Sequence, residues 1–280
     1  MIGEKYMKQI RLVALDLDGT VFNDQKEISP RTLAAIRAAL EKGVAVLPAT
    51  GRTVRGVPEQ FLSIPGVRYA LTSNGASVVD LQTGEKLVSL PFEAAAAERA
   101  FDVLAPFGGM LSIFINGQSY TTIENARTSM DMVPPNLREY FRTTRIEVPD
   151  MHAMMEQHPH EIEKFSILYP TEEIRDTAWK AVAAACPELE TASSIERNLE
   201  LNAPGVSKGP GLMALAQRLG LTRDEVMAVG DSGNDRTMVE LAGLGVAMGN
   251  ATEDIKQAAD VITADNNHDG VAEAIEKYVL

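Results

Sequence analysis

The sequence predicts an α/β fold in which a parallel sheet carries a second, α+β domain inserted into it. Three observations predict this fold. Apolar runs of strand length alternate with amphipathic helical stretches toward both ends of the chain. Three of these runs end in a polar cluster, and the middle of the chain holds hairpin signals that the two ends lack. We therefore expect a parallel-sheet domain over residues 1–89 and 203–280, with the insertion at 90–202.

The first strand–helix–strand unit begins close to the N-terminus. Residues 9–17 are an apolar run that is too short for a helix and bounded by an Asp-Gly turn, so we predict a buried strand. Ser29 and Pro30 are a helix cap and a first-turn proline, and Gly43 is placed to end that helix. A second strand is expected at 44–47. Strand, helix and strand in this order form the βαβ unit of parallel sheets.

The C-terminal third of the chain repeats this alternation. A helical stripe of leucines ends at Gly220, and a strand is expected over 225–229. Two more short strands, at 245–248 and 260–263, precede a helix that reaches Val279. The alternation supports a parallel sheet assembled from both ends of the chain.

The middle of the chain shows a different pattern. Hairpins are expected around Thr83-Gly84 and Asn116-Gly117. The remaining elements expected here are helices at 93–105 and 171–185, a polar helical stretch ending near Phe141, a strand at 165–169 and extended pieces around 192–202. Three of the four histidines fall between 152 and 160 without zinc-ligand spacing, and we expect a surface loop there.

Composition excludes several classes of function. The 280 residues carry a net charge of -13, which argues against nonspecific binding to nucleic acid or to an anionic membrane. The single cysteine, Cys186, cannot form an internal disulfide and is expected to be a packed thiol. Neither an N-terminal apolar signal core nor a run of about 18 apolar residues is present. We expect a soluble cytoplasmic protein; the sequence leaves its oligomeric state undetermined.

The polar clusters that follow the three strands read DLDGT, ATGR and GDSGND. In an open parallel sheet, ligands bind outside the carboxyl ends of the strands, so these clusters should open onto one edge. Asp16, Asp18 and Asp231 would then crowd together. At ~4 Å and an effective dielectric of ~20, each carboxylate pair repels by about 4 kcal/mol. An all-oxygen acidic site that must be neutralised suits Mg²⁺, which keeps its waters for a substrate phosphate.

The same clusters contain the groups that phosphoryl transfer requires. Asp16 is the candidate nucleophile, because carboxylates can form aspartyl-phosphate intermediates. Asp18, two residues later, can donate and accept the proton. Lys208 precedes a helix and can hold both nucleophile and phosphate, although it could also cap loop carbonyls.

Three consecutive residues of the ATGR cluster are candidates for phosphate binding. The Thr50 hydroxyl and the Gly51 amide can donate hydrogen bonds to phosphoryl oxygens. Arg52 can add positive charge to the phosphate site, or it can be an ordinary surface charge that forms an ion pair.

These clusters, with SKG before the last of them, resemble in this order the four motifs of the haloacid dehalogenase (HAD) superfamily of phosphatases. Further matches at 73–76, 245–251 and 266–271 resemble its Cof-like (HAD-IIB) branch. The resemblance implies a Rossmann-like core with an inserted α+β cap of the C2B type, between the second and third motifs.

The resemblance also implies roles for individual residues. Asp16 would attack phosphorus and ligate Mg²⁺, and Asp18 would act as acid and base while giving its backbone carbonyl to the metal. Asp231 would be the third protein ligand. Asn234 would contact phosphate or order the site, and Asp235 would support the site from behind.

Some of these motifs also have a simpler interpretation. Asp235 can equally well cap the helix that follows it, through the helix dipole. Asn74, in the 73–76 match, is more typical of a turn than of a substrate contact. Residues 265–276 fit the pattern of a calcium-binding EF-hand loop, but a strand rather than a helix is expected before them.

The sequence therefore predicts a Mg²⁺-dependent phosphatase, a phosphoric monoester hydrolase acting on small phosphorylated metabolites through an aspartyl-phosphate. By resemblance, sugar phosphates are the expected substrates. Two alternatives stay open: a phosphomutase on the same core, and a non-catalytic protein that binds a phosphorylated metabolite.

Overall fold

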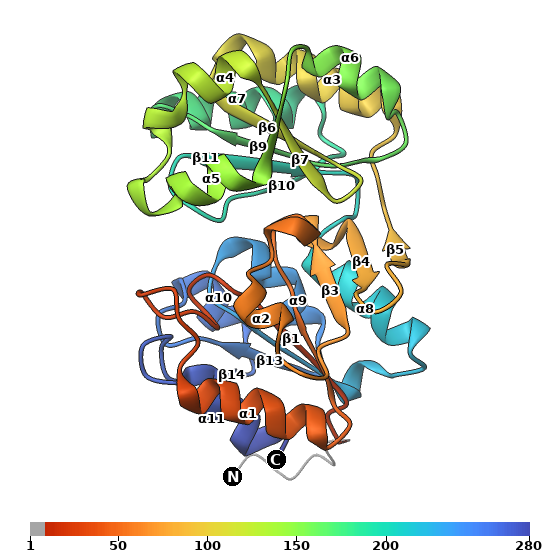
Figure 1. Cartoon of the computed structure of the whole chain (residues 1–280), viewed down its shortest axis with the longest axis vertical. Helices are drawn as coiled ribbons and strands as arrows, with labels where there is room; N and C mark the ends of the chain where they lie inside the picture. Colours follow the sequence, from red (N-terminus) through yellow and green to blue (C-terminus); the bar gives the residue numbers. More distant parts are fainter. Residues whose placement is uncertain (1–8) are drawn as a thin grey trace. The chain divides into compact units, whose positions relative to one another are not determined.

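Figure 1 shows the computed structural model of the chain, in which residues 9–280 are described. The chain divides into two compact units. The core unit consists of Val57–Val88, Ser207–Leu280 and the described residues up to Thr50. The insert unit consists of Ser89–Val206 together with the short segment Gly51–Gly56. That segment falls inside the range predicted for the parallel-sheet domain, yet it packs with the insertion.

The core unit is built on a five-stranded sheet with the order β14-β13-β12-β1-β2, and every neighbouring pair is parallel. Its strands are β1 (Leu12–Leu15), β2 (Ala45–Pro48), β12 (Val226–Gly230), β13 (Leu244–Ala247) and β14 (Val261–Ile262). β1 lies in the centre of the sheet, between β12 from the C-terminal third and β2 from the first βαβ unit. The predicted α/β class with a parallel sheet is confirmed.

Helices cover both faces of this sheet. They are α1 (Pro30–Glu41), α2 (Glu59–Leu62), α8 (Lys208–Arg218), α9 (Arg236–Leu241), α10 (Glu253–Ala258) and α11 (Gly270–Tyr278). Val13 and Leu15 of β1 belong to the hydrophobic cluster that includes α1 and α11, whereas Leu12 and Ala14 belong to the cluster that includes α8. Successive strand residues thus face opposite layers, which explains why β1 is apolar throughout.

The first helix forms for the reasons that the sequence indicates. The Ser29 hydroxyl oxygen accepts a hydrogen bond from the Thr32 amide at 3.0 Å, and Pro30 occupies the first turn. Gly43 follows the helix with φ of 80°, a conformation that glycine adopts without steric cost.

A small antiparallel sheet, in the order β3-β4-β5, completes the core unit. Its strands are β3 (Tyr69–Thr72), β4 (Ser77–Asp80) and β5 (Lys86–Ser89), so the predicted hairpin around Thr83-Gly84 is present. Short 3₁₀ turns occur at Ser73–Gly75, Arg223–Glu225 and Gly233–Asp235.

The insert unit contains a six-stranded sheet in the order β10-β11-β9-β6-β7-β8. Its strands are β6 (Met110–Ile115), β7 (Gln118–Thr122), β8 (Arg145–Val148), β9 (Ile162–Leu168), β10 (Glu190–Ala192) and β11 (Asn198–Asn202). All pairs are antiparallel except β7 with β8. This mixed arrangement confirms the α+β character of the insertion.

Helices and short turns complete the insert unit. Its helices are α3 (Ala94–Leu104), α4 (Ile123–Thr128), α5 (Arg138–Thr144), α6 (Met151–Gln157) and α7 (Glu172–Ala185). Its 3₁₀ turns lie at Val54–Gly56, Ala105–Phe107, Met130–Met132 and Pro135–Leu137. In Figure 1, α3, α6 and α7 gather on one face of the sheet. Cys186, directly after α7, is a buried free thiol.

One sequence expectation in this unit is wrong. The histidine-containing segment that was expected as a surface loop begins with the helix α6. The Asp150 carboxylate caps this helix by accepting hydrogen bonds from the His152 and Ala153 amides. Met151 and Met155, four residues apart, are buried on one face, and this packing favours the helix.

Two further findings concern the chain as a whole. Within residues 9–280, no helix combines the length and the apolar character that a membrane crossing requires. The EF-hand interpretation also fails, because the strand β14 rather than a helix precedes the loop, and Glu276 is ion-paired with Arg31.

Candidate active site

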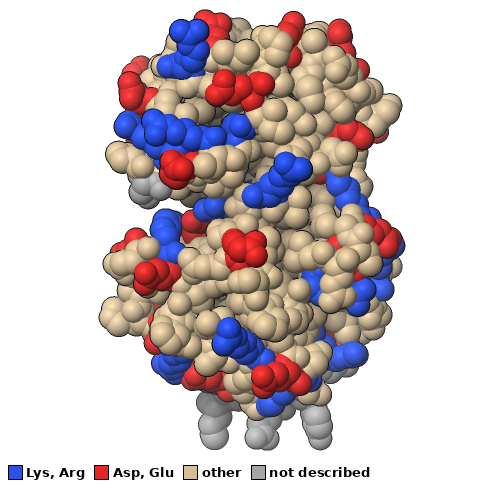
Figure 2. All heavy atoms as spheres, in the orientation of Figure 1, with Lys and Arg blue, Asp and Glu red and all other residues tan. Residues whose placement is uncertain are grey.

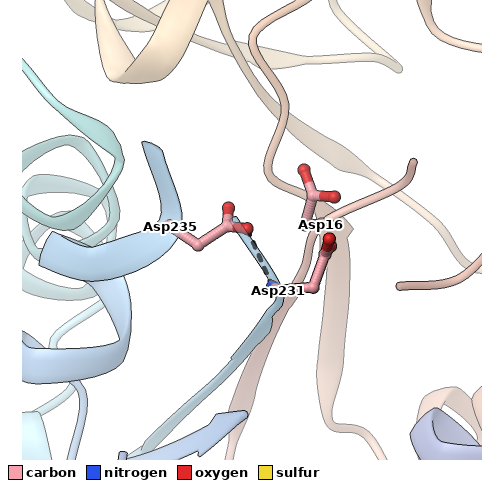
Figure 3. Close-up of side chains that lie close together, drawn as sticks. All are labelled: Asp16, Asp231 and Asp235. Atoms are coloured by element: carbon pink, nitrogen blue, oxygen red, sulfur yellow. Dashed lines mark hydrogen bonds between the residues drawn. The ribbon is translucent and has the colours of Figure 1, made fainter. Parts of the chain in front are cut away.

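The carboxyl ends of the adjacent strands β1 and β12 place two acids side by side. Leu15 lies opposite Val229 in the parallel ladder, so Asp16 and Asp231 leave the sheet at the same edge. Asp235 joins them from the turn that follows β12, and one carboxylate oxygen from each of the three lies within 4.8 Å of the others. Figure 3 shows these three carboxylates gathered at the ends of the two strands.

Lys208, the first residue of α8, lies between two of these acids. Its side chain is fully buried, and its Nζ donates hydrogen bonds of 2.6 Å to Asp16 Oδ1 and of 2.6 Å to Asp235 Oδ1. α8 packs closely against the turn Ser73–Gly75 because Gly211 has no side chain: a Cβ there would lie 2.8 Å from the Cα of Gly75. Lys208 therefore contacts acids rather than capping loop carbonyls.

Asp235 fixes the loop that carries Asp231. Its Oδ2 accepts hydrogen bonds of 3.0 Å from the amides of Asp231 and Ser232, and the first of these is the dashed line in Figure 3. Gly230 makes this closure possible, since a Cβ there would lie 2.5 Å from Asp235 Cβ. One side chain thus orders the loop and holds Lys208.

Two residues of the loop that follows β1, Gly19 and Thr20, lie against the Asp231 carboxylate. Thr20 donates a hydrogen bond of 2.7 Å from Oγ1 to Asp231 Oδ1. Gly19 has a φ of 88°, and a Cβ at this position would lie 2.6 Å from Asp231 Oδ2. Sequence reasoning did not assign Thr20 a function, although its place in the DLDGT cluster was the available signal.

We expect Gly19→Ala to destabilise the protein and to displace Asp231. The substitution combines a left-handed backbone with a clash against the carboxylate, and such changes typically cost about 1–3 kcal/mol. Gly43→Ala is the matched control, because Gly43 has a similar φ of 80° but nothing within 4 Å of its Cβ position. Equal losses in the unfolding midpoints of both variants would show that contact with Asp231 contributes nothing.

The Asp18 side chain lies beside this cluster, and Asp235 supplies the third clustered carboxylate. Asp18 is 38% exposed and forms an ion pair of 3.0 Å with Lys26, while its charge contributes to the raised pKa of Asp231. The reason is local. The chain turns directly after Leu17, whose carbonyl accepts a hydrogen bond from the Phe22 amide, and Asp18 lies on that turn rather than on the strand.

The ATGR residues are divided between the two units. Thr50 is buried in the core unit, where its amide donates to the Leu71 carbonyl and its carbonyl accepts from the Asn74 amide. Gly51 belongs to the insert unit, where its carbonyl accepts a hydrogen bond of 2.8 Å from Lys164 Nζ. Arg52 also belongs to the insert unit and lies over the ring of Tyr140.

Asn234 is linked to the turn Ser73–Gly75, which connects β3 to β4. Its Nδ2 lies 3.3 Å from Asn74 Oδ1, and its Oδ1 accepts from Ser232 Oγ at 2.9 Å. Asn74 has a left-handed φ of 57°, which asparagine tolerates better than most residues. The turn interpretation of Asn74 is therefore confirmed, and the turn also contacts a candidate site residue.

Crowding of acids in a buried place perturbs their protonation. Burial raises the pKa of Asp16 well above its usual range, with added repulsion from Asp235 and Asp231 and opposition from Lys208. Burial and the Asp235 carboxylate likewise raise the pKa of Asp231 to about 7. Burial lowers the pKa of Lys208, but the attraction of Asp16 and Asp235 outweighs it and raises that pKa. One lysine therefore faces three acids.

The donor set fits Mg²⁺. The side chains gathered at the site offer carboxylate oxygens, which this hard cation prefers. Asp16 uses Oδ1 for Lys208, and Asp231 uses Oδ1 for Thr20. Within residues 9–280, the other carboxylate oxygen of each acid accepts no hydrogen bond, so these two oxygens remain for a cation.

We expect the metal-free protein to lose stability as pH rises from about 4 to about 7. A carboxyl whose pKa rises from 3.8 to about 7 on folding makes the native state bind more protons than the unfolded state in this window. Stability then falls with rising pH. Carboxyl groups with lowered pKa values, such as Asp80 beside Arg68, change the stability at lower pH. They therefore do not mask the fall in stability above pH 5.

Thermal unfolding in a chelator at pH 5.5 and pH 8 measures this effect. Asp231→Asn should flatten the dependence. Mg²⁺ should raise the midpoint more at pH 8 than at pH 5.5, because its ligands must be deprotonated. An equal Mg²⁺ effect at both pH values would contradict the assignment.

Comparison with known proteins identifies the family. Residues 13–275 match the family of haloacid dehalogenase-like hydrolases. The chain belongs to this family. It is similar to a 5-amino-6-(5-phospho-D-ribitylamino)uracil phosphatase of Bacillus subtilis, with 32% identity over 97% of the chain and 96% of the relative. The phosphatase YwpJ of the same organism is also 32% identical, over 97% of this chain and 100% of the relative.

Solved structures agree with this family assignment. A haloacid dehalogenase-like hydrolase from B. subtilis superimposes with a TM-score of 0.82 at 29% identity, over 96% of this chain and 99% of that one. One from Bacteroides thetaiotaomicron gives 0.80 at 27% identity, over 96% and 99%. The predicted membership of the Cof-like HAD branch is confirmed, as is the prediction of an enzyme, a phosphoric monoester hydrolase.

Proposed function

We propose that this HAD hydrolase is a Mg²⁺-dependent phosphatase that forms an aspartyl-phosphate on Asp16. Its substrates would be small phosphorylated metabolites, in particular phosphates of sugars or sugar alcohols. One observation carries the proposal: Asp16 is a buried carboxylate with one oxygen held by Lys208 and the other available beside Asp231. The ribityl phosphate in the name of the B. subtilis relative supports the substrate class.

The proposed chemistry has two steps. In the first, an Asp16 oxygen attacks phosphorus, the bond from phosphorus to the ester oxygen breaks, and Asp18 gives the leaving alkoxide its proton. In the second, Asp18 takes a proton from water as its oxygen attacks the aspartyl-phosphate, and Asp16 leaves as a carboxylate with release of inorganic phosphate. The partly exposed position of the Asp18 side chain supports this role, because the leaving group and the attacking water must both reach it.

Lys208 would orient the nucleophile in both steps. Its hydrogen bond to Oδ1 holds the Asp16 carboxylate in one orientation for attack on phosphorus. Asp235 keeps the Lys208 ammonium in place through the second 2.6 Å contact. The positive charge also opposes the negative charge that the incoming phosphate adds to an already acidic site.

The groups that would hold the metal and the phosphate come from the same loops. Mg²⁺ would be held by the carboxylates of Asp16 and Asp231 and by the Asp18 carbonyl. When bound, it supplies electrostatic stabilisation of the phosphoryl oxygens. Thr50, the Gly51 amide, Arg52 and Asn234 are the proposed donors to the transferred phosphoryl group. The insert unit would be the cap that selects the substrate.

Phosphate release tests the proposal. The full-length protein should hydrolyse p-nitrophenyl phosphate and members of a sugar phosphate panel with Mg²⁺, and lose this activity in a chelator. Retained phosphate on an isomerised sugar would instead indicate a phosphomutase. No turnover with any divalent metal would indicate a metabolite-binding protein.

We also place the activity in a reducing compartment such as the cytoplasm, which the free thiol of Cys186 supports.

A further inference from the structure

The insert unit contains two arginines that share one aromatic ring. The guanidinium carbon of Arg52 lies 4.3 Å from the ring centroid of Tyr140, and that of Arg145 lies 4.9 Å from the same centroid. Arg145 also lies 3.5 Å from the centroid of Phe141. Such stacking orients a guanidinium but supplies no negative charge to neutralise it.

Arg145 is half-buried, and its partners differ from those of the buried lysines. Its side chain donates to two neutral hydroxyls, Ser112 Oγ at 3.3 Å and Thr144 Oγ1 at 2.9 Å. Among residues 9–280, no carboxylate oxygen lies within 4.0 Å of an Arg145 guanidinium nitrogen, so Arg145 forms no ion pair there. By contrast, the buried Lys164 of the same unit is paired with Glu200 at 2.8 Å.

The surroundings of Arg145 are short of negative charge. Burial lowers the pKa of its guanidinium; Tyr140 opposes this shift, and the neighbouring Arg52 adds to it. Figure 2 shows a row of lysine and arginine side chains on one face of the insert unit, with acidic side chains next to it. A half-buried arginine without a carboxylate partner favours binding of an anion from outside the chain.

The two arginines are held in fixed positions. Arg52 Nη1 donates to the Gly56 carbonyl at 3.1 Å, and Gly56 lies so close to Tyr140 that a Cβ there would be 2.9 Å from the phenolic oxygen. The segment 51–56 thus packs directly against α5. Arg52 also follows Thr50, a proposed phosphate donor, by two residues in the chain.

We propose that Arg145, beside Arg52, recognises a second anionic group of the substrate, either a carboxylate or a second phosphate. This inference rests on the proposed phosphatase function and narrows its substrate class. The preferred substrates are phosphate esters that carry another anion in addition to the phosphate that is removed. The planar guanidinium, oriented by Phe141, suits bidentate contact with such a group.

Matched substrate pairs test this inference. Glucose 6-phosphate is compared with 6-phosphogluconate, and fructose 6-phosphate with fructose 1,6-bisphosphate. Wild type should show at least tenfold higher kcat/KM for the second member of one pair, and the responding pair tells whether the anion is a carboxylate or a phosphate. Arg145→Met should lower that value about 10- to 100-fold, as expected for loss of a charged hydrogen bond.

The remaining variants separate recognition from structure. Arg145→Met should change kcat/KM for the singly phosphorylated members and for p-nitrophenyl phosphate less than threefold, and Arg145→Lys should recover part of the loss. Arg142→Met, at an exposed position of α5, is the control and should behave as wild type. A uniform loss on all substrates, or no wild-type preference for the second anion, would overturn the proposal.

The proposed function can fail separately from this inference. If wild type turns over none of these compounds, calorimetric binding of 6-phosphogluconate and fructose 1,6-bisphosphate replaces kinetics. Affinity at least tenfold above that for the singly phosphorylated partner, lost in Arg145→Met, would still support the anion site. No difference in affinity would end it.

Discussion

Asp16→Asn is expected to abolish turnover while leaving the protein folded. An amide cannot form the aspartyl-phosphate, and removal of a catalytic nucleophile costs on the order of 10⁴- to 10⁶-fold in kcat. Stability should respond in the opposite direction. Because burial and two neighbouring acids raise the pKa of Asp16, its charged form is unfavourable in the metal-free protein. A neutral asparagine removes that repulsion, and Lys208 keeps Asp235 as a partner.

Phosphate release and thermal unfolding in a chelator measure the two effects. We expect no detectable release above background, and a midpoint in chelator at pH 8 that equals or exceeds that of wild type. Asp102→Asn makes the same chemical change at an exposed position of α3 and should alter neither quantity. An Asp16→Asn variant that retains a tenth of the wild-type rate would exclude Asp16 as the nucleophile.

The meeting of Asp16 and Asp231 was predictable from the sequence because it depends on a general rule of parallel sheets. Both residues directly follow apolar strands, and neighbouring parallel strands end at one edge. The rule needs no knowledge of loop geometry. It therefore placed the two acids together across more than two hundred intervening residues.

The third clustered carboxylate depends on loop geometry, which the strand pattern does not specify. Asp18 follows Asp16 by two residues, but the chain turns between them and the side chain reaches Lys26. Asp235 reaches the cluster only because the 3₁₀ turn Gly233–Asp235 folds back onto the Asp231 amide. Local composition does not specify how tightly such a turn closes.

The insert unit was less predictable for a related reason. β8 pairs in parallel with β7, and this pairing needs the helical connection between them to return the chain in register. Arg145 and Glu147 make β8 resemble a polar loop. The Arg52–Tyr140–Arg145 arrangement likewise joins residues about ninety positions apart, so no local pattern announces it.

Lys208→Met is expected to reduce both activity and stability. The substitution removes the cation that contacts Asp16 and Asp235 at 2.6 Å and leaves buried acids without it. Loss of one partner from a buried ion pair typically costs about 3–5 kcal/mol. Turnover should fall because the nucleophile loses its orientation and the phosphate loses a positive charge. Lys180→Met, on the exposed surface of α7, is the matched control and should be neutral in both measurements.

The pH dependence of the Lys208→Met variant separates electrostatics from packing. Without the ammonium, the carboxyl groups of Asp16 and Asp231 should hold their protons to a higher pH, so the variant should regain stability as pH falls from 8 to 5. Lys208→Met combined with Asp235→Asn should recover part of the stability at pH 8, because one unpaired buried charge is gone, but none of the activity. A loss that is the same at pH 5 and pH 8, and that Asp235→Asn does not relieve, would mean that Lys208 contributes through packing of α8 and not through its charge.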